Sequence, residues 1–108
     1  MEVKMIDVSV HNGVIDWDKV KASGIGGVLM RCGYGSDIES QDDKMFKRNA
    51  DECSRLGIPF GVYLYSYAKN TDMAKSEADH VLRLVKGYKL SYPLYIDVEE
   101  ASQSLSLI

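Results

Sequence analysis

The stretch YPLYIDVEE, residues Tyr92–Glu100, decides the fold because a strand-like apolar run carries acids at alternate positions. Side chains alternate between the two faces of a strand, so residues two apart share a face. One face consists of Leu94, Ile96 and Val98. The other face consists of Tyr95, Asp97 and Glu99. We expect the aliphatic face to pack on helices and the acidic face to line a more polar space.

Outward from this stretch, strand-like apolar runs alternate with helix-like patterns along the chain. The expected strands are 3–10, 26–33, 58–68 and 92–99, and the expected helices are 16–24, 43–57 and 71–87. Asp16 is a candidate N-cap for the first helix, and Thr71 or Asp72 for the third. A polar loop is expected at 36–42. This order of elements predicts parallel strands joined by crossover helices.

Polar side chains recur near the carboxyl end of each expected strand, on the face opposite the aliphatic one. They are Asp7, Arg31, Tyr63, Tyr65, Asp97 and Glu99. A sheet covered by helices on both sides would have two aliphatic faces. In a β/α barrel, by contrast, the functional residues lie inside the barrel opening at the carboxyl ends of the strands. The sequence therefore predicts an α/β fold, a parallel β/α barrel of TIM type. Such a barrel needs about eight strands and roughly 250 residues, so residues 1–108 are expected to form a truncated half-barrel, part of a single domain.

Composition narrows the classes of function. The chain has 108 residues, is 45% hydrophobic and has a formal charge of -3. This charge gives no sign of the excess of basic residues that binding to nucleic acid or an anionic membrane requires. No apolar run approaches the roughly 20 residues of a membrane span, and the N-terminus lacks the apolar core of a signal peptide. Cys32 and Cys53 are interpreted as buried thiols, with a disulfide left open. Trp17 and His80 are expected to be structural.

The acidic face has the residue types of a glycosidase site. Asp97 and Glu99 lie two apart on one strand, so their Cα atoms are about 6.5 Å apart, and Asp7 adds a third acid. Three neighbouring carboxyls cannot all ionise easily, so we expect one of them to keep its proton. A protonated carboxyl beside an ionised one is the pair that glycosidases use. Tyrosines beside such a pair suit contacts with sugar rings.

Plainer interpretations stay open for each of these residues. The acid pair is also compatible with a solvated strand end or a Mg²⁺ site. Arg31 is expected to neutralise the acids. His11 precedes a turn signal at Asn12 and Gly13, which favours a surface residue over part of a substrate subsite. The tyrosines of the third strand also suit a barrel core; they are Tyr63, Tyr65 and Tyr67.

Four motifs together resemble glycoside hydrolase family 25, the Chalaropsis-type lysozymes of bacteria and phage endolysins. The motifs are MIDVSVHNGVIDWDKVKASGI (5–25), VLMRCGYG (28–35), FKRNADECSRLGIPFGVYLYSYA (46–68) and YIDVEE (95–100). They cover nearly the whole chain and keep the order and spacing of the family. Such a combination is hard to produce by chance, so the resemblance is specific.

The resemblance implies hydrolysis of the β-1,4 bond between N-acetylmuramic acid and N-acetylglucosamine in peptidoglycan. Glu99 would be the general acid, Asp97 would act as a base or position the substrate's own N-acetyl group, and Asp7 would stabilise charge or position substrate. The candidate substrate-binding residues are Tyr65, which matches a family tyrosine near the cleaved sugar, then Tyr63, Arg31 and His11. The implied place of action is the cell wall, for a secreted bacterial enzyme or a phage endolysin.

The resemblance also implies that no metal or organic cofactor is needed and that the expected partners are peptidoglycan glycan strands. Family members continue through four more strands, so this chain is expected to be the N-terminal half of the catalytic domain. Open edges on the first and fourth strands predict self-association into a homo-oligomer. Two other functions stay open: an inactive remnant that binds cell-wall carbohydrate, and a Mg-dependent barrel enzyme.

Overall fold

The computed structural model describes residues 4–97, in which strands and helices alternate as the sequence predicts. The elements are β1 (Met5–Val8), the 3-10 helix η1 (Val10–Asn12), α1 (Trp17–Ala22), β2 (Gly27–Tyr34), the 3-10 helix η2 (Glu39–Gln41), α2 (Phe46–Leu56), β3 (Phe60–Tyr65), α3 (Thr71–Val85) and β4 (Tyr95–Asp97). All the strand pairs are parallel, in the order β1-β2-β3-β4. The α/β fold with a parallel sheet is therefore confirmed.

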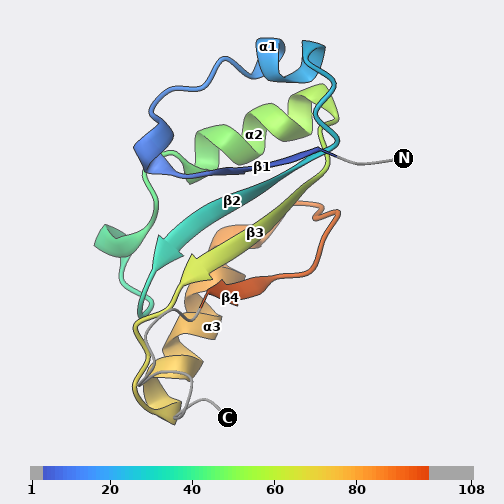
Figure 1. Cartoon of the computed structure of the whole chain (residues 1–108). Helices are drawn as coiled ribbons and strands as arrows, with labels where there is room; N and C mark the ends of the chain where they lie inside the picture. The colour runs from blue at the N-terminus through green and yellow to red at the C-terminus, as the bar shows by residue number, and fades with distance from the viewer. Residues whose placement is uncertain (1–3, 98–108) are drawn as a thin grey trace.

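The helices α2 and α3 cover one face of this sheet, and its opposite face is turned to the viewer in Figure 1. The covered face is aliphatic, as predicted for the first three strands. Its buried side chains are Val8 from β1, Val28 and Met30 from β2, and Val62 and Leu64 from β3. They pack with Phe46, Ala50 and Cys53 of α2 and with Val81 of α3. Removal of this apolar surface from water is the main stabilising contribution of the layer.

The strand β4 differs from its prediction. It is only three residues long, and Leu94 and Ile96 are 40% and 44% exposed rather than packed on a helix. The reason is position, because α3 lies against β2 and β3 while β4 is at the sheet edge. Val98, the third expected aliphatic residue, lies outside the described residues.

The helix ends follow local chemistry, with one correction. Asp16 caps α1, as predicted, by accepting a hydrogen bond of 3.2 Å from the backbone N–H of Lys19. The cap of α3 is Asn70 rather than Thr71 or Asp72, because the Asn70 side chain accepts from the N–H of Met73 at 2.9 Å. The expected loop 36–42 also contains the short helix η2.

The residues interpreted as structural are buried. The Trp17 indole donates to the Asn49 side chain at 3.1 Å between the two buried residues, which fixes α1 on α2. Cys32 and Cys53 are buried free thiols, so the interpretation as thiols is confirmed over the disulfide. Burial raises the pKa of each thiol to about 12. None of the helices between residues 4 and 97 has the length and apolar composition needed to cross a bilayer.

Candidate active site

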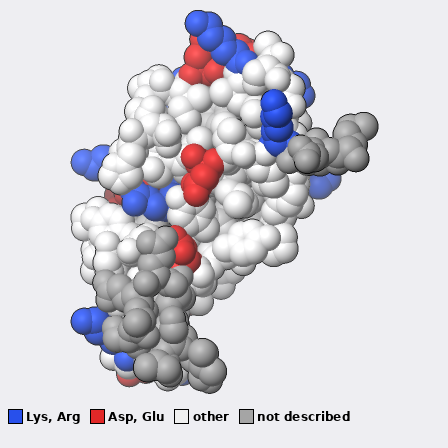
Figure 2. Space-filling view, in the orientation of Figure 1, with Lys and Arg blue, Asp and Glu red and all other residues white. Residues whose placement is uncertain are grey.

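The uncovered face of the sheet carries the predicted polar residues. Asp7 is exposed on β1, whereas Arg31, Tyr63 and Asp97 are half-buried on β2, β3 and β4. Strand register places Tyr63 beside Arg31, and Tyr65 beside Asp97. In Figure 2 this face is largely uncharged, with acidic and basic side chains gathered near its middle. The parallel strands therefore bring residues from positions 7 to 97 onto one surface.

The pKa of the Tyr63 phenol depends on the charged side chains of the other strands. Burial raises its pKa, and interaction with the Asp7 carboxylate raises it further. Asp97 acts in the same direction with its charge, while Arg31 opposes the shift. The pKa of this one phenol is thus affected by a charged group from each of the other three strands. Asp7 and Asp97 both act on the Tyr63 phenol, although their strands, β1 and β4, lie at opposite edges of the sheet. Glu99, the predicted partner of Asp97, lies outside the described residues.

Arg31 has a different partner from the one expected. Its Nε donates at 3.0 Å to the carboxylate of Asp43, a residue that the sequence placed at a helix start. The buried Asp43 carboxylate also accepts from the backbone N–H groups of Val10 at 2.8 Å and Met45 at 2.9 Å. We expected Arg31 to neutralise the acids on the strands. The ion pair that it forms is instead with Asp43. Asp43 instead ties together the segments that follow β1 and β2.

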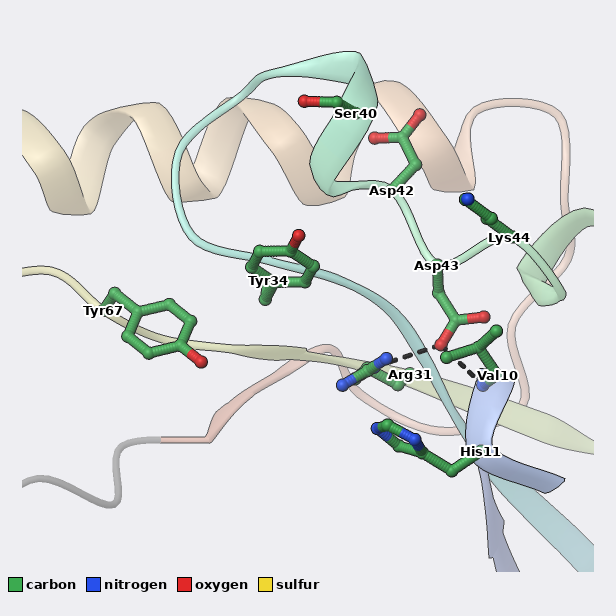
Figure 3. A pocket seen from close by; sticks show the side chains of 9 residues that line it. All are labelled: Val10, His11, Arg31, Tyr34, Ser40, Asp42, Asp43, Lys44 and Tyr67. Atoms are coloured by element: carbon green, nitrogen blue, oxygen red, sulfur yellow. Dashed lines mark hydrogen bonds and ion pairs between the residues drawn. The ribbon is translucent and has the colours of Figure 1, made fainter.

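Beside this ion pair lies a pocket of about 380 Å³, shown in Figure 3. Its lining residues are Val10, His11, Arg31, Tyr34, Ser40, Asp42, Asp43, Lys44 and Tyr67. The structure thus brings His11, in η1, to the same pocket as Arg31. Sequence reasoning missed Tyr34 and Lys44 here. It also grouped Tyr67 with barrel-filling tyrosines, whereas the ring is 44% exposed.

Buried polar groups on α3 support the end of β3. The Glu77 carboxylate accepts from the Ser66 hydroxyl at 2.6 Å and from the backbone N–H of Tyr67 at 2.8 Å. The backbone N–H of Ser66 donates to the carbonyl of Asp97 at 2.9 Å. Glu77 therefore holds the segment to which the Asp97 backbone is bonded. Glu77 is a buried residue of α3, and these two donors explain how its carboxylate is accommodated there.

A second polar cluster on α3 holds the loop after β2. His80 is fully buried, with ring nitrogens 2.9 Å from the Gly35 carbonyl and 2.7 Å from the Asp42 carboxylate. This confirms a structural role for His80. Arg83 donates to the same carboxylate at 2.7 and 3.0 Å. Partial burial of Asp42 opposes ionisation, but the hydrogen bonds and charges of Arg83 and His80 outweigh it, so the pKa of Asp42 is lowered. Between residues 4 and 97 no group of three or more His, Cys, Asp or Glu side chains is arranged to hold a metal ion.

Comparison with known proteins places these observations in a family. The model of glycosyl hydrolases family 25 matches residues 6–106. An autolytic lysozyme of Clostridium acetobutylicum is 30% identical over 97 residues, which are 90% of this chain and 28% of that protein. The modular autolysin LytC from Streptococcus pneumoniae, solved in complex with a synthetic peptidoglycan ligand, is 42% identical with a TM-score of 0.82.

Coverage of these relatives is partial. The match to LytC covers 94% of this chain and 24% of that chain, so the present chain spans about a quarter of the length of these relatives. The catalytic domain of an endolysin from a bacteriophage of Listeria monocytogenes has the same fold, with a TM-score of 0.82 at 23% identity. That match covers 94% of this chain and 50% of the endolysin domain.

Proposed function

The chain belongs to glycosyl hydrolases family 25, and from this premise we propose that it carries the acidic centre of a peptidoglycan-cleaving lysozyme. The bond cleaved is the β-1,4 linkage between N-acetylmuramic acid and N-acetylglucosamine. The observation that carries the proposal is that Asp7, Tyr63 and Asp97 lie on the uncovered face of one parallel sheet, where both carboxylates raise the pKa of the Tyr63 phenol. Glycosidic cleavage requires two carboxyl groups that flank the cleaved bond, and we propose that Asp97 and Glu99 are this pair.

We further propose that the sheet is one half of a TIM-type barrel. Sequential parallel order and helices confined to one face support this, because a barrel buries its inner face by closing on itself. The match to half of the Listeria phage endolysin domain supports the same geometry. In this arrangement the exposed Leu94 and Ile96 on β4 are the side chains that further elements would cover.

Roles are assigned to the acids by their positions. Glu99 donates a proton to the leaving oxygen, and Asp97 either acts as a base or positions the substrate's N-acetyl group. Asp7 stabilises positive charge that develops on the sugar ring. Tyr63 keeps its proton, because its pKa is raised, and can donate a hydrogen bond to a neighbouring oxygen. This chemistry needs no metal or organic cofactor.

The candidate binding residues surround these acids in two positions. Tyr65 lies next to Asp97 in register and contacts the sugar at the cleaved bond. Arg31 and His11 lie at the neighbouring pocket, where they form hydrogen bonds with hydroxyl or acetyl oxygens. The glycan strand of peptidoglycan is the partner that this set of residues suits, and the place of action is the cell wall.

The test is clearance of a bacterial cell-wall suspension, followed by turbidity and by release of reducing ends. We expect the Glu99→Gln and Asp97→Asn variants to clear walls at least about 100-fold more slowly than the native chain, since each removes an acid or a base. The variant Asp18→Asn, which changes an exposed acid on α1, is the matched control. Equal rates for the native chain and Glu99→Gln would reject the enzyme and favour a carbohydrate-binding role. Loss of activity with a chelator would favour a Mg-dependent enzyme.

Self-association through the sheet edges is a separate proposal. In the described part of the chain, β1 pairs with β2 alone and β4 with β3 alone. Unpaired strand edges favour pairing with another chain, and exposed Tyr95 and Ile96 on β4 add apolar surface. Equilibrium sedimentation is expected to give a mass above that of the monomer. A folded monomer at all concentrations would contradict this.

A further inference from the structure

We propose that Tyr34 and Tyr67 form a second sugar-binding subsite, which takes a neutral N-acetylglucosamine ring away from the cleaved bond. The inference rests on the proposed function and names a specificity site for the same glycan. The pocket beside these rings measures about 380 Å³, a volume within the usual range of small-ligand sites. Figure 3 shows both rings at one end of the pocket, opposite Lys44 and His11.

An aromatic row connects this pocket to the proposed catalytic acids. Tyr65 is the register partner of Asp97. Its ring lies 5.0 Å from the ring of Tyr67, and Tyr67 lies 6.0 Å from Tyr34 in an edge-to-face arrangement. Aromatic rings in such a row offer successive apolar surfaces with polar tips. A glycan bound at Asp97 can therefore continue over Tyr65 and Tyr67 to reach the pocket.

Hydrogen bonds and ion pairs hold the walls of the pocket. Asp43 joins Arg31 to the backbone of Val10, and Asp42 is held by His80 and Arg83. Behind Tyr34, the Gln41 side chain donates to the Tyr34 carbonyl at 2.8 Å. A site whose side chains are already ordered loses little conformational freedom on binding. Two of these partners, Asp43 and His80, are buried and anchor the walls.

Two ion pairs compensate most of the charge around the pocket. The positive charge of Arg31 is matched by Asp43 at 3.0 Å, and the negative charge of Asp42 is matched by Arg83 at 2.7 Å. These charges are therefore compensated within the protein, and the exposed Lys44 adds a positive charge to the lining. The remaining polar groups, Ser40, His11 and Lys44, are hydrogen-bonding partners for hydroxyl and acetyl oxygens. This combination of hydrogen-bonding groups suits the hydroxyl and acetyl oxygens of a sugar.

The test measures binding of N-acetylglucosamine oligomers, from the disaccharide to the hexasaccharide, by isothermal titration. We expect affinity to rise with chain length in the native chain. The double variant Tyr34→Ala, Tyr67→Ala is expected to weaken hexasaccharide binding by about tenfold or more while leaving the disaccharide unchanged, because burial of a ring face is lost. Tyr67→Phe keeps the ring and should retain the length dependence. Leu82→Ala, an exposed change on α3, is the control.

Five results bear on this inference and on the proposed function. If the double variant keeps the native length dependence, or if no oligomer binds, the second subsite is rejected. Equal weakening for short and long oligomers would place the two rings in the cleavage site itself, which also rejects a separate subsite. If the length dependence is lost in the variant while the native chain fails to clear walls, the subsite stands and the lysozyme proposal fails. Loss of the length dependence in a chain that clears walls supports both.

Discussion

Ser66 donates its hydroxyl to the carboxylate of Glu77 at 2.6 Å, inside the interface between β3 and α3. Both side chains are almost fully buried. The same carboxylate accepts from the backbone of Tyr67, and the Ser66 backbone reaches Asp97. Glu77 thus links a helix that lies outside the site to two residues that we place in it.

Replacing Glu77 by Gln tests this link. A Gln side chain has a single acceptor oxygen, so one of the two buried donors loses its partner, at a cost of about 1–3 kcal/mol in the free energy of unfolding. Urea denaturation measures that loss. We also expect wall clearance to fall by a larger factor than the unfolded fraction explains, because the segment bonded to Asp97 moves. Activity that tracks the folded fraction would limit Glu77 to a structural role.

Asp43→Asn is expected to be among the more damaging single changes. It leaves the largely buried Arg31 guanidinium with a neutral partner in place of a carboxylate. Removal of one partner of a buried pair costs about 3–5 kcal/mol of stability. The control is Asp18→Asn, whose partner Arg55 is exposed, and it should change stability by less than about 1 kcal/mol. Similar denaturation midpoints for the two variants would contradict the assigned role.

Ionisation of Asp42 makes the stability of the folded chain depend on pH, in a direction that the structure defines. Folding lowers the pKa of its carboxyl, so ionised Asp42 favours the folded state. That stabilisation is complete above the usual value of 3.8 and disappears as the pH falls through the lower folded value. Asp42→Asn should therefore reduce stability at neutral pH and flatten its fall below about pH 4. An unchanged acid limb in thermal melts of the variant would refute this.

Tyr63 gives the corresponding dependence at high pH. Burial and the nearby carboxylates raise its pKa above the usual 10.0, so the phenol ionises only under strongly alkaline conditions. Folding contributes stability through this group below pH 10.0, and the contribution is lost as the pH rises further. In an ultraviolet titration, the Tyr63→Phe variant should lack part of the absorbance change that the native chain shows above pH 10.0. Below pH 10.0 the two titration curves should agree. A difference at lower pH would overturn the assignment.

The two cysteines should be chemically silent in the folded chain. Burial raises the pKa of Cys32 and of Cys53 to about 12, and the thiolate is the reactive form. A thiol reagent at neutral pH should label neither residue until denaturant is added, and then label both. Rapid labelling of the native chain would show that the core around α2 opens readily.

Much of the fold could be predicted because its signals are local. Because side chains alternate between the two faces of a strand, Val62 and Leu64 could be assigned to the covered face. The preference of Asp for the N-cap position identified Asp16 as the start of α1. The same alternation put Asp7 and Asp97 on the uncovered face. Prediction was wrong where the neighbours matter more than the pattern, as at Ile96, whose strand lies beyond the cover of α3. The position of Glu99 stays a prediction.

The sequence by itself determined the order of strands and helices, the two faces of each inner strand and the family, because short-range periodicity and ordered motifs encode them. Only the tertiary structure decided the pairing of Arg31 with Asp43, the clasp between His80 and Asp42, and the contact of Tyr34 with Tyr67. These contacts join residues of strands, loops and helices that are up to 38 positions apart. They depend on how layers meet in space, which a local pattern of residues does not encode.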